Sequence, residues 1–214
     1  MTKYMEDQLD MPLGDVLARM QQGIMERTTY FGVPTHKNPN DAWMYQQIIV
    51  AMRPDVIVEI GTKYGGSTLY LAHLCDLLGH GRVISVDHHH GFLRPEPGQH
   101  PRVTLLLGDA CETFARVRAA IGPQERVLVI EDSSHTYDNT LAVLRTYTEL
   151  TRPGDYFIVE DSICHHGLPL GPSPGPYEAI EAFVAENPDF EVDRSQEALL
   201  ITWNPKGYLR RRPA

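Results

Sequence analysis

The fold is decided at residues 54–67, which read PDVIVEIGTKYGGS. The first part, Val56–Ile60, is a short apolar run rich in β-branched residues and is typical of a buried strand. Glycines follow at once, where they let the backbone curve tightly and let a ligand approach its amides. A helical stretch, residues 67–78, comes next, with Ser67 expected as its N-cap. A strand, a Gly-rich turn and a helix in this order indicate an open α/β sheet, which binds ligands at the carboxyl ends of its strands.

The same alternation continues toward the C-terminus. Further strands are expected at residues 82–87, 103–107, 127–130 and 155–159, with helices at 111–121 and 136–150 between them. Apolar strands separated by helices predict a parallel sheet covered on both faces. After a helix at 177–186, two more strands are expected at 190–193 and 199–203, and the short link 194–197 allows only antiparallel pairing. The sequence therefore predicts a doubly wound, Rossmann-like α/β fold with a seven-stranded sheet and an antiparallel last strand, over residues 54–214.

Residues 1–53 precede this domain. Apolar side chains recur there at helical spacing from Leu13 to Ile24, which predicts an amphipathic helix. We interpret residues 1–53 as a helical extension that packs on the domain or on a second subunit, which favours a homo-oligomer, or as a lid over the site. Residues 167–176 hold four prolines and three glycines, so they predict a long loop. Loops change substrate without changing fold, so specificity is expected in the N-terminal segment and in residues 162–176.

Composition narrows the class of protein. The chain has 214 residues, of which 42% are apolar and 22% charged, as in ordinary globular proteins. The net charge of −9 disfavours nucleic acid and anionic membrane as partners, because both require a basic surface. No apolar stretch is long enough to cross a bilayer, and residues 1–10 lack the apolar core of a signal peptide. The three scattered cysteines are expected to be reduced thiols, so the predicted location is the cytoplasm.

The Gly-rich turn also bears on the ligand. Lys63 stands where a dinucleotide fingerprint needs its middle glycine, and the Gly-Lys-Ser/Thr of a P-loop is absent. The pattern Glu-x-Gly-x-x-x-Gly-Gly-Ser instead resembles motif I of class I S-adenosylmethionine (SAM)-dependent methyltransferases. In that family an acid at the end of the second strand, here Asp87, binds the ribose hydroxyls, and the end of the third strand, here Asp109, contacts the adenine. The resemblance implies cofactor binding by Glu59, Gly61, Thr62, Gly65, Ser67, Asp87, His88, Asp109, Ala110 and Asp132.

Two neighbouring strands end in acids. The fourth strand is followed by EDSSH at 131–135, and the fifth by Glu160 and Asp161. Converging carboxylates repel one another unless a positive charge lies among them, and a hard dication such as Mg²⁺ is the simplest choice. Such an ion could hold two neighbouring oxygens of a diol and lower the pKa of one, while His135 removes the proton. Strand side chains alternate between faces, so Glu160 and Asp161 can share an ion only if the chain twists out of the sheet. In the alternative interpretation, one acid of each pair caps a turn or pairs with a surface arginine.

Taken together, residues 54–67, 131–135, 154–161 and 204–209 resemble the cephalosporin hydroxylase-like family, with similarity from about Tyr30 to Arg210. That family has a methyltransferase fold and includes Mg²⁺-dependent O-methyltransferases of sugars and natural products, such as rhamnosyl methyltransferases. The resemblance implies Mg²⁺ or Mn²⁺ at Asp132, Glu160 and Asp161 and His135 as the general base. We leave Glu131 outside the metal site, because it can equally cap a turn or pair with a surface arginine. Catechol-type relatives carry Asp-Asn where this chain has Glu160-Asp161, so their substrate class is not carried over.

The predicted function is therefore the transfer of a methyl group from SAM to a hydroxyl, one of a vicinal pair on a sugar or small natural product. One alternative is a non-haem iron hydroxylase with a two-His-one-carboxylate site, for which His135, His165 and His166 are available. The other is a SAM-binding module without enzymatic activity. His165 and His166 could also touch the substrate or merely line the loop. The identity of the acceptor and of the native metal stays open.

Overall fold

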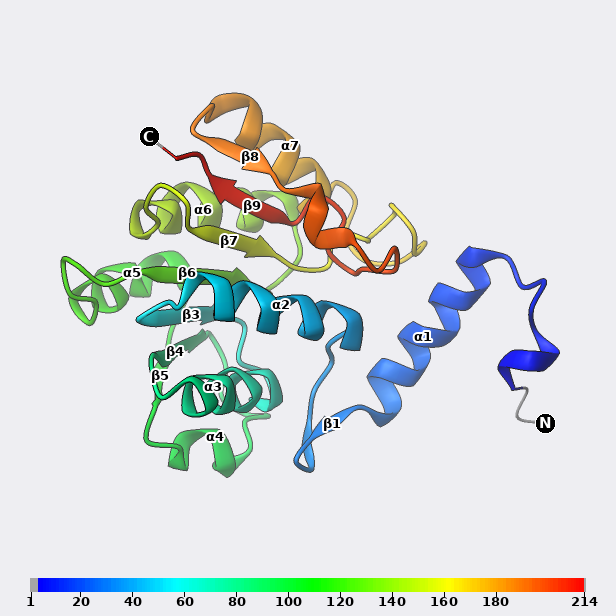
Figure 1. The fold of residues 1–214 in the computed structure, drawn as a ribbon, viewed down its shortest axis with the longest axis horizontal. Coiled ribbons are helices and arrows are strands. Elements are labelled where there is room, and N and C mark those ends of the chain that lie inside the picture. Colours follow the sequence, from blue (N-terminus) through cyan, green and yellow to red (C-terminus); the bar gives the residue numbers. More distant parts are fainter. Residues whose placement is uncertain (1–3, 214) are drawn as a thin grey trace.

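The central sheet has seven strands in the order β5-β4-β3-β6-β7-β9-β8 (Figure 1). Strands β5, β4, β3, β6 and β7 pair in parallel, and β9 runs antiparallel to both of its neighbours. This computed structural model describes residues 4–213. The strands are β3 Val56–Ile60, β4 Arg82–Asp87, β5 Val103–Leu107, β6 Val127–Glu131, β7 Tyr156–Val159, β8 Phe190–Val192 and β9 Tyr208–Arg211. The doubly wound α/β sheet with an antiparallel last strand is confirmed.

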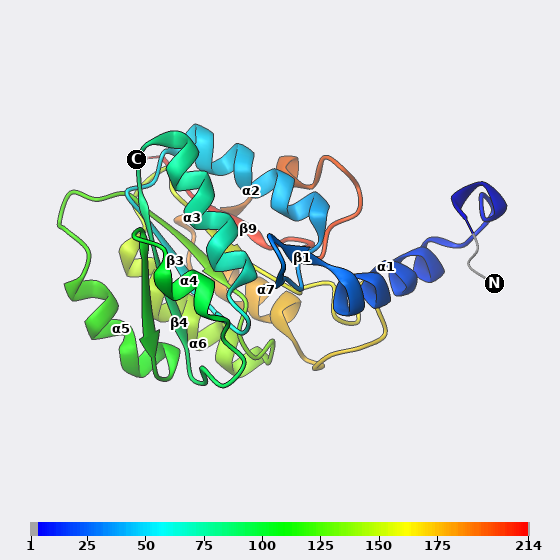
Figure 2. The ribbon, with the colours of Figure 1, turned by 90° about the horizontal axis from the view of Figure 1, so that it is seen from below.

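Helices cover both faces of the sheet (Figure 2). Alternate side chains of β3 explain this arrangement: Val58 packs into a core with α6 and α7, whereas Ile57 packs into a core with α2 and α3. Every residue of β3 is buried, as expected for a strand covered twice. The helices of the sheet region are α2 Pro39–Met52, α3 Gly66–Leu78, α4 Pro95–Gln99, α5 Ala110–Ala119, α6 Tyr137–Tyr147 and α7 Pro176–Glu186; short 3₁₀ turns are η2 Thr148–Leu150 and η3 Arg194–Glu197.

The expected strand at residues 199–203 is wrong. The partner of β8 is β9, with Phe190 opposite Arg211, and the chain between η3 and β9 is a loop. Leu200 is 79% exposed there, whereas the backbone amide of Trp203 donates to the buried carboxylate of Asp41 at 2.8 Å. The apolar residues of this segment have the pattern of a strand, but the carboxylate of Asp41 holds the backbone at Trp203 in an irregular conformation. The predicted antiparallel pairing of the last strands is right, but the strand that pairs with β8 is Tyr208–Arg211 and not residues 199–203.

The N-terminal segment forms a helical arm and a small hairpin. After the 3₁₀ turn η1 Met5–Asp7, helix α1 Leu13–Arg27 extends away from the sheet (Figures 1 and 2). The hairpin of β1 Thr29–Tyr30 and β2 Val33–Pro34 then leads into α2. Within α1, Leu17 and Ile24 are buried against Ile163, Leu168 and Trp203, which belong to loops beside the carboxyl edge of the sheet. No helix among residues 4–213 is long and apolar enough to span a membrane.

The carboxyl ends of the parallel strands form one edge, and the loops after them carry the predicted site residues. Ile60 lies opposite Glu131 in β6, and Glu131 lies opposite Val159 in β7. Just beyond these ends, His135 and Asp161 have φ values of +57° and +55°. Left-handed backbone is uncommon for residues other than glycine and clusters at functional sites. At Asp161 it turns the chain out of the strand, which is the twist that the alternation of side chains required.

Candidate active site

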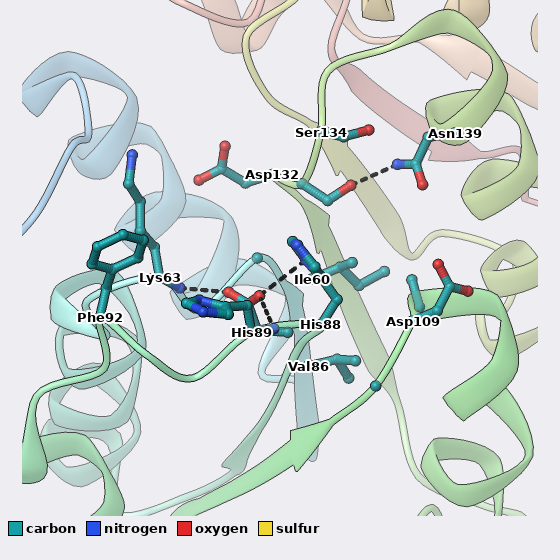
Figure 3. Close-up of a pocket in the computed structure, with 15 residues that line it drawn as sticks. Ile60, Lys63, Val86, His88, His89, Phe92, Asp109, Asp132, Ser134 and Asn139 are labelled. Atoms are coloured by element: carbon teal, nitrogen blue, oxygen red, sulfur yellow. Dashed lines mark hydrogen bonds and ion pairs between the residues drawn. The ribbon is translucent and has the colours of Figure 1, made fainter.

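A cavity of about 500 Å³ opens at the carboxyl ends of β3, β4, β5 and β6 (Figure 3). Six of the ten predicted cofactor residues line it: Gly61, Asp87, His88, Asp109, Ala110 and Asp132. We call it the cofactor cavity. Residues that the sequence did not single out complete its wall, among them Phe92 and Asn139. Nothing in the sequence around these two marked them as site residues.

The carboxylate of Asp87 ties two loops of this cavity together. Its Oδ2 accepts from the backbone amide of Lys63 at 2.7 Å, and its Oδ1 accepts from the amide of His89 at 2.9 Å. Each carboxylate oxygen can accept a further hydrogen bond. Asp87 can therefore hold the Gly-rich turn in place and still accept from the two hydroxyls of a ribose.

Gly61 allows the close approach of two backbones in the wall of the cavity. A Cβ at this position would lie 1.9 Å from the carbonyl oxygen of Asp132, and the φ of Gly61 is +105°. Both features require glycine. Asp109, at the end of β5, accepts from the amides of Cys111 and Glu112 and so caps α5 while lining the cavity.

Four predicted cofactor residues do not line the cofactor cavity. Thr62 and Gly65 build the turn itself, since the amide of Gly65 donates to the carbonyl of Thr62 at 2.7 Å. Glu59 and Ser67 instead line a second cavity, of about 380 Å³. The expected N-cap role of Ser67 is wrong: the N-cap of α3 is Gly65, and the hydroxyl of Ser67 donates to the buried carboxylate of Glu59 at 2.5 Å. Because Gly65, in a left-handed conformation, precedes the helix as its N-cap, the Ser67 hydroxyl can donate to Glu59 instead.

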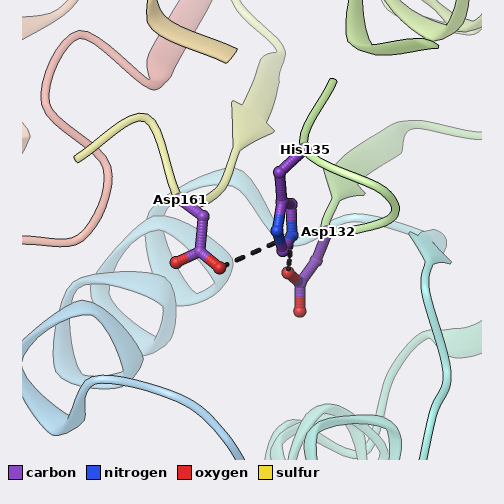
Figure 4. Close-up of side chains that lie close together, drawn as sticks. All are labelled: Asp132, His135 and Asp161. Carbon is purple, nitrogen blue, oxygen red and sulfur yellow. Dashed lines mark hydrogen bonds and ion pairs between the residues drawn. The ribbon is translucent and has the colours of Figure 1, made fainter. Parts of the chain in front are cut away.

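Asp132 after β6 and Asp161 after β7 converge on His135 (Figure 4). Nε2 of His135 lies 3.0 Å from Oδ1 of Asp132 and 3.5 Å from Oδ2 of Asp161. Ligand atoms of these three residues all lie within 4.8 Å of one another, a spacing that one metal ion could bridge. Asp161 therefore joins the cluster, as the sequence interpretation required, although its neighbour Glu160 takes a different partner.

Glu160 is buried and contacts a lysine that sequence reasoning missed. The ammonium of Lys37 lies 2.5 Å from Oε1 of Glu160 and also contacts Oδ2 of Asp132. Lys37 stands in the loop before α2, 95 residues before Asp132. No local motif marks it, because its significance depends on the packing of this loop against the ends of two strands.

The charges in this cluster change the pKa values of its members. Burial by itself would raise the pKa of Asp132, but the charges of Lys37 and His135 hold it at about 2. Burial opposes a charge on His135, yet the hydrogen bond that it donates to Asp132 and the charge of Asp161 raise its pKa to about 9. Burial and the charge of Asp132 raise the pKa of Glu160 well above its usual range. His135 is therefore protonated at pH 7 while these acids act on it alone, and a cation that offsets them would lower its pKa and leave the neutral imidazole free to accept a proton.

A third cavity, of about 290 Å³, opens on the other side of Asp132, and we call it the acceptor cavity. It shares Gly61, Lys63, Asp132 and Ser133 with the cofactor cavity. His135 and Asp161 line only the acceptor cavity. Its remaining wall is largely apolar and comes from α1, the loop before α2, the loop after β7 and the segment before β9: Gln21, Met25, His36, Ile163, Cys164, Leu168, Leu170, Gly171 and Trp203. Sequence reasoning expected specificity in the N-terminal segment and in residues 162–176, but it named none of these residues and took the segment of Trp203 for a strand.

The remaining predicted candidates have other contacts. Nε2 of His165 lies 3.1 Å from the carbonyl of Gly171, and Nε2 of His166 lies 2.7 Å from Glu178. Glu131 is buried and accepts from the amide of Ser133 at 3.2 Å. Within residues 4–213, the cluster at Asp132 thus holds one histidine and two aspartates, whereas the iron hydroxylase alternative needs two histidines and one carboxylate.

Known proteins match both the sequence and the fold. The family described as rhamnosyl O-methyltransferase/CmcI matches residues 22–212. The rhamnosyl O-methyltransferase of Mycobacterium tuberculosis strain H37Rv is 34% identical over 195 residues, which cover 88% of this chain and 80% of that protein. A solved CmcI structure described with SAH (S-adenosylhomocysteine) has a TM-score of 0.66 and 25% identity, and covers 86% of this chain and 81% of its own.

Another CmcI structure, described as the Mg-SAM form, has a TM-score of 0.68 and 23% identity over 86% of this chain and 76% of its own. This likeness shows the class I methyltransferase fold. The family match spans nearly the whole described chain, including the Gly-rich turn, the acids after β6 and β7 and the loop before β9. The chain belongs to the rhamnosyl O-methyltransferase/CmcI family.

Proposed function

We propose that this protein transfers a methyl group from SAM to a hydroxyl of a small hydroxylated molecule. The observation that carries the proposal is the meeting of two cavities at Asp132, with His135 lining only the acceptor cavity. A methyl donor in one cavity and a hydroxyl in the other would approach each other beside this histidine. Bringing the reacting atoms within about 3–3.5 Å of each other in line is a large part of such catalysis.

The cofactor cavity suits an adenosine-containing ligand. Asp87 offers a carboxylate to the ribose, and Phe92 and His89 offer flat side chains in the same wall. The family relative CmcI is described with SAH, the product of methyl transfer, which supports the same ligand class here. When bound, SAM supplies an electrophilic methyl group on sulfur.

The acids suit a hard dication such as Mg²⁺ or Mn²⁺, because their donors are carboxylate oxygens. We propose Asp132, Glu160 and Asp161 as its ligands. The ammonium of Lys37 supports this, because it is a positive charge that lies between Asp132 and Glu160. When bound, the dication supplies positive charge that lowers the pKa of a nearby hydroxyl.

We propose His135 as the general base. With SAM bound, the acceptor oxygen would take the methyl group as the carbon–sulfur bond breaks, and Nε2 of neutral His135, which faces Asp132 and Asp161, would take the hydroxyl proton. The products would be a methyl ether, S-adenosylhomocysteine and the imidazolium of His135, which carries the proton and the positive charge that the sulfonium loses.

We propose that the acceptor is a vicinal diol, on a sugar or a small natural product. The largely apolar wall of the acceptor cavity contains one polar atom that needs a partner: Nδ1 of His36 is buried and has no hydrogen bond among the described residues. Burial lowers the pKa of His36, so its ring is neutral at pH 7 and can bond a hydroxyl. The mycobacterial relatives are named rhamnosyl O-methyltransferases, so a rhamnoside is the first acceptor to test.

The test combines metal removal with one variant. Purified protein is incubated with radiolabelled SAM and an acceptor panel that includes a rhamnosyl glycoside and a catechol. We expect a labelled ether that disappears in EDTA and returns with Mg²⁺. His135→Ala should lower turnover by roughly 10²–10⁴-fold, the usual share of a general base, with SAH affinity unchanged because His135 does not line the cofactor cavity.

His80→Ala is the matched control, because His80 pairs with Asp55 at 3.2 Å at the opposite end of the strands. Full turnover in EDTA would remove the metal from the proposal. Unaltered turnover of His135→Ala would exclude His135 as the general base.

A further inference from the structure

A lysine side chain already supplies positive charge to the proposed metal site. The Lys37 ammonium contacts Asp132 and Glu160 together, and only 11% of its side chain is exposed. Opposite charges in such a water-poor place attract one another strongly, and removing one partner leaves an uncompensated buried charge. The two acids therefore have a tethered cation between them before any dissolved ion arrives.

We propose that Lys37 is a resident counter-cation that competes with the dication for Asp132 and Glu160, and that it thereby sets the metal affinity of the site. This inference rests on the proposed function, which brings the dication there. The metal can take up the oxygens that Lys37 contacts only if the ammonium gives them up. Metal affinity is then the gain from the metal–oxygen bonds minus the loss of these ion pairs.

The backbone at Lys37 is held firmly, so the competition involves the side chain. Asn38, the next residue, caps α2 by accepting from the amide of Asn40 at 3.3 Å. The same Asn38 is buried and donates to Asp41 at 2.9 Å. A lysine carries its ammonium on a flexible four-carbon stem, so the ammonium of Lys37 can move while the backbone contacts of Asn38 persist.

The structure offers the displaced ammonium both room and a partner. The cavity of about 380 Å³ next to the site is lined by Lys37, Glu160 and Glu59. Glu59 is a third buried carboxylate whose charge acts on Lys37. Lys37 could therefore leave Asp132 and remain beside negative charge, which keeps its displacement from being prohibitively costly.

Two other roles for Lys37 make different predictions. As a proton acceptor it would have to be neutral, but the surrounding acids keep the ammonium charged. As a purely structural clamp it would hold Asp132 and Glu160 in position for the metal. Removing a clamp weakens metal binding, whereas removing a competitor strengthens it.

The experiment measures the affinity for Mn²⁺ alone, from the electron paramagnetic resonance signal of the free ion. We expect Lys37→Met to bind Mn²⁺ about tenfold or more tightly than the unchanged protein. Lys206→Met is the matched control, because Lys206 forms a similar 2.5 Å pair with Glu181 on α7 and should leave the Kd within twofold.

A second variant and a second measurement cover the chance that Lys37→Met folds poorly. Lys37→Gln removes the charge but keeps a polar end. Without metal, both variants should unfold at a lower temperature than the unchanged protein, and Mn²⁺ should raise their Tm by more, since ligand stabilisation grows with [L]/Kd.

An equal or weaker Mn²⁺ affinity in both Lys37 variants would overturn the inference and leave the proposed function standing. Failure of every form to bind Mn²⁺ would overturn the inference and the metal part of the function together. Variants that stay unfolded in saturating Mn²⁺ would also contradict it, because the dication should replace the lost charge.

Discussion

Replacing Gly61 by alanine should disrupt the junction between the cofactor cavity and the acid cluster. The new Cβ would lie 1.9 Å from the carbonyl oxygen of Asp132 and 2.7 Å from its carbonyl carbon. Both backbones are pinned, since Gly61 donates to the carbonyl of Val86 and Asp132 donates to that of Ile60, each at 2.8 Å. No side chain can move to relieve this contact, so the strands themselves must shift.

The magnitude follows from two costs. Left-handed backbone costs a residue with a Cβ about 1–2 kcal/mol, and forcing an atom into filled space costs about 1–3 kcal/mol. Gly61→Ala should therefore lose roughly 2–5 kcal/mol of the free energy of unfolding, which at about 2–4 °C per kcal/mol lowers Tm by roughly 4–20 °C. Gly154→Ala is the control: its φ is +88°, but no described atom lies within 4 Å of its Cβ. It should lose only the first cost, roughly 2–8 °C of Tm.

The assay is thermal and urea unfolding of both variants, followed by calorimetry with SAH at a temperature where both are folded. We expect Gly61→Ala to be less stable than Gly154→Ala and to bind SAH more weakly, because a shifted strand end moves Asp132 in the cavity wall. Equal stability and equal SAH affinity for the two variants would refute the contact as the reason for glycine at 61.

Two further predictions concern carboxylates. Asp87→Ala should weaken SAH binding by roughly 10²–10⁴-fold, because two hydrogen bonds to a charged group contribute about 1.5–3 kcal/mol each; an unchanged Kd in calorimetry would exclude Asp87 from the ribose site. The hydrogen bond from Arg82 lowers the pKa of Glu125 from 4.5 to about 2, so the stabilisation by Glu125 is complete above pH 4.5 and is lost as pH falls toward 2. Urea unfolding should accordingly find that the advantage of the unchanged protein over Glu125→Gln shrinks across this range, and a constant difference would contradict the ion pair.

The parts of the site that the sequence predicted lie at or just after the ends of strands. Asp87 is the last residue of β4, and Asp109 and Asp132 follow β5 and β6 within two residues, so their places at the carboxyl edge follow from the mainly apolar pattern of these strands and their parallel pairing. Such inference needs no knowledge of distant contacts. The same reasoning brought Asp161 to the edge, and its φ of +55° then lets it join Asp132.

The parts that the sequence missed depend on contacts across the chain. Residues 199–203 read as a strand because Leu199 to Ile201 are apolar, but Asp41, about 160 residues earlier, accepts from the hydroxyl of Thr202 and the amide of Trp203. Lys37 likewise acquires its partners only when the loop before α2 packs on β6 and β7. Residues 35–41 carry no local periodicity, so these contacts have no counterpart in the sequence pattern.

The two cavities differ in origin, and this difference bears on how such a fold changes its acceptor. The cofactor cavity is built from the ends of β3 to β6 and the loops after them, whose positions the hydrogen-bonded sheet fixes. The acceptor cavity draws Met25 from α1, Leu168 from the loop after β7 and Trp203 from the segment before β9. None of these three belongs to the sheet, and each can change without disturbing the register of the strands. Because Asp132 and Gly61 stand in both walls, the proposed site of methyl transfer can stay fixed while the side chains that line only the acceptor cavity vary.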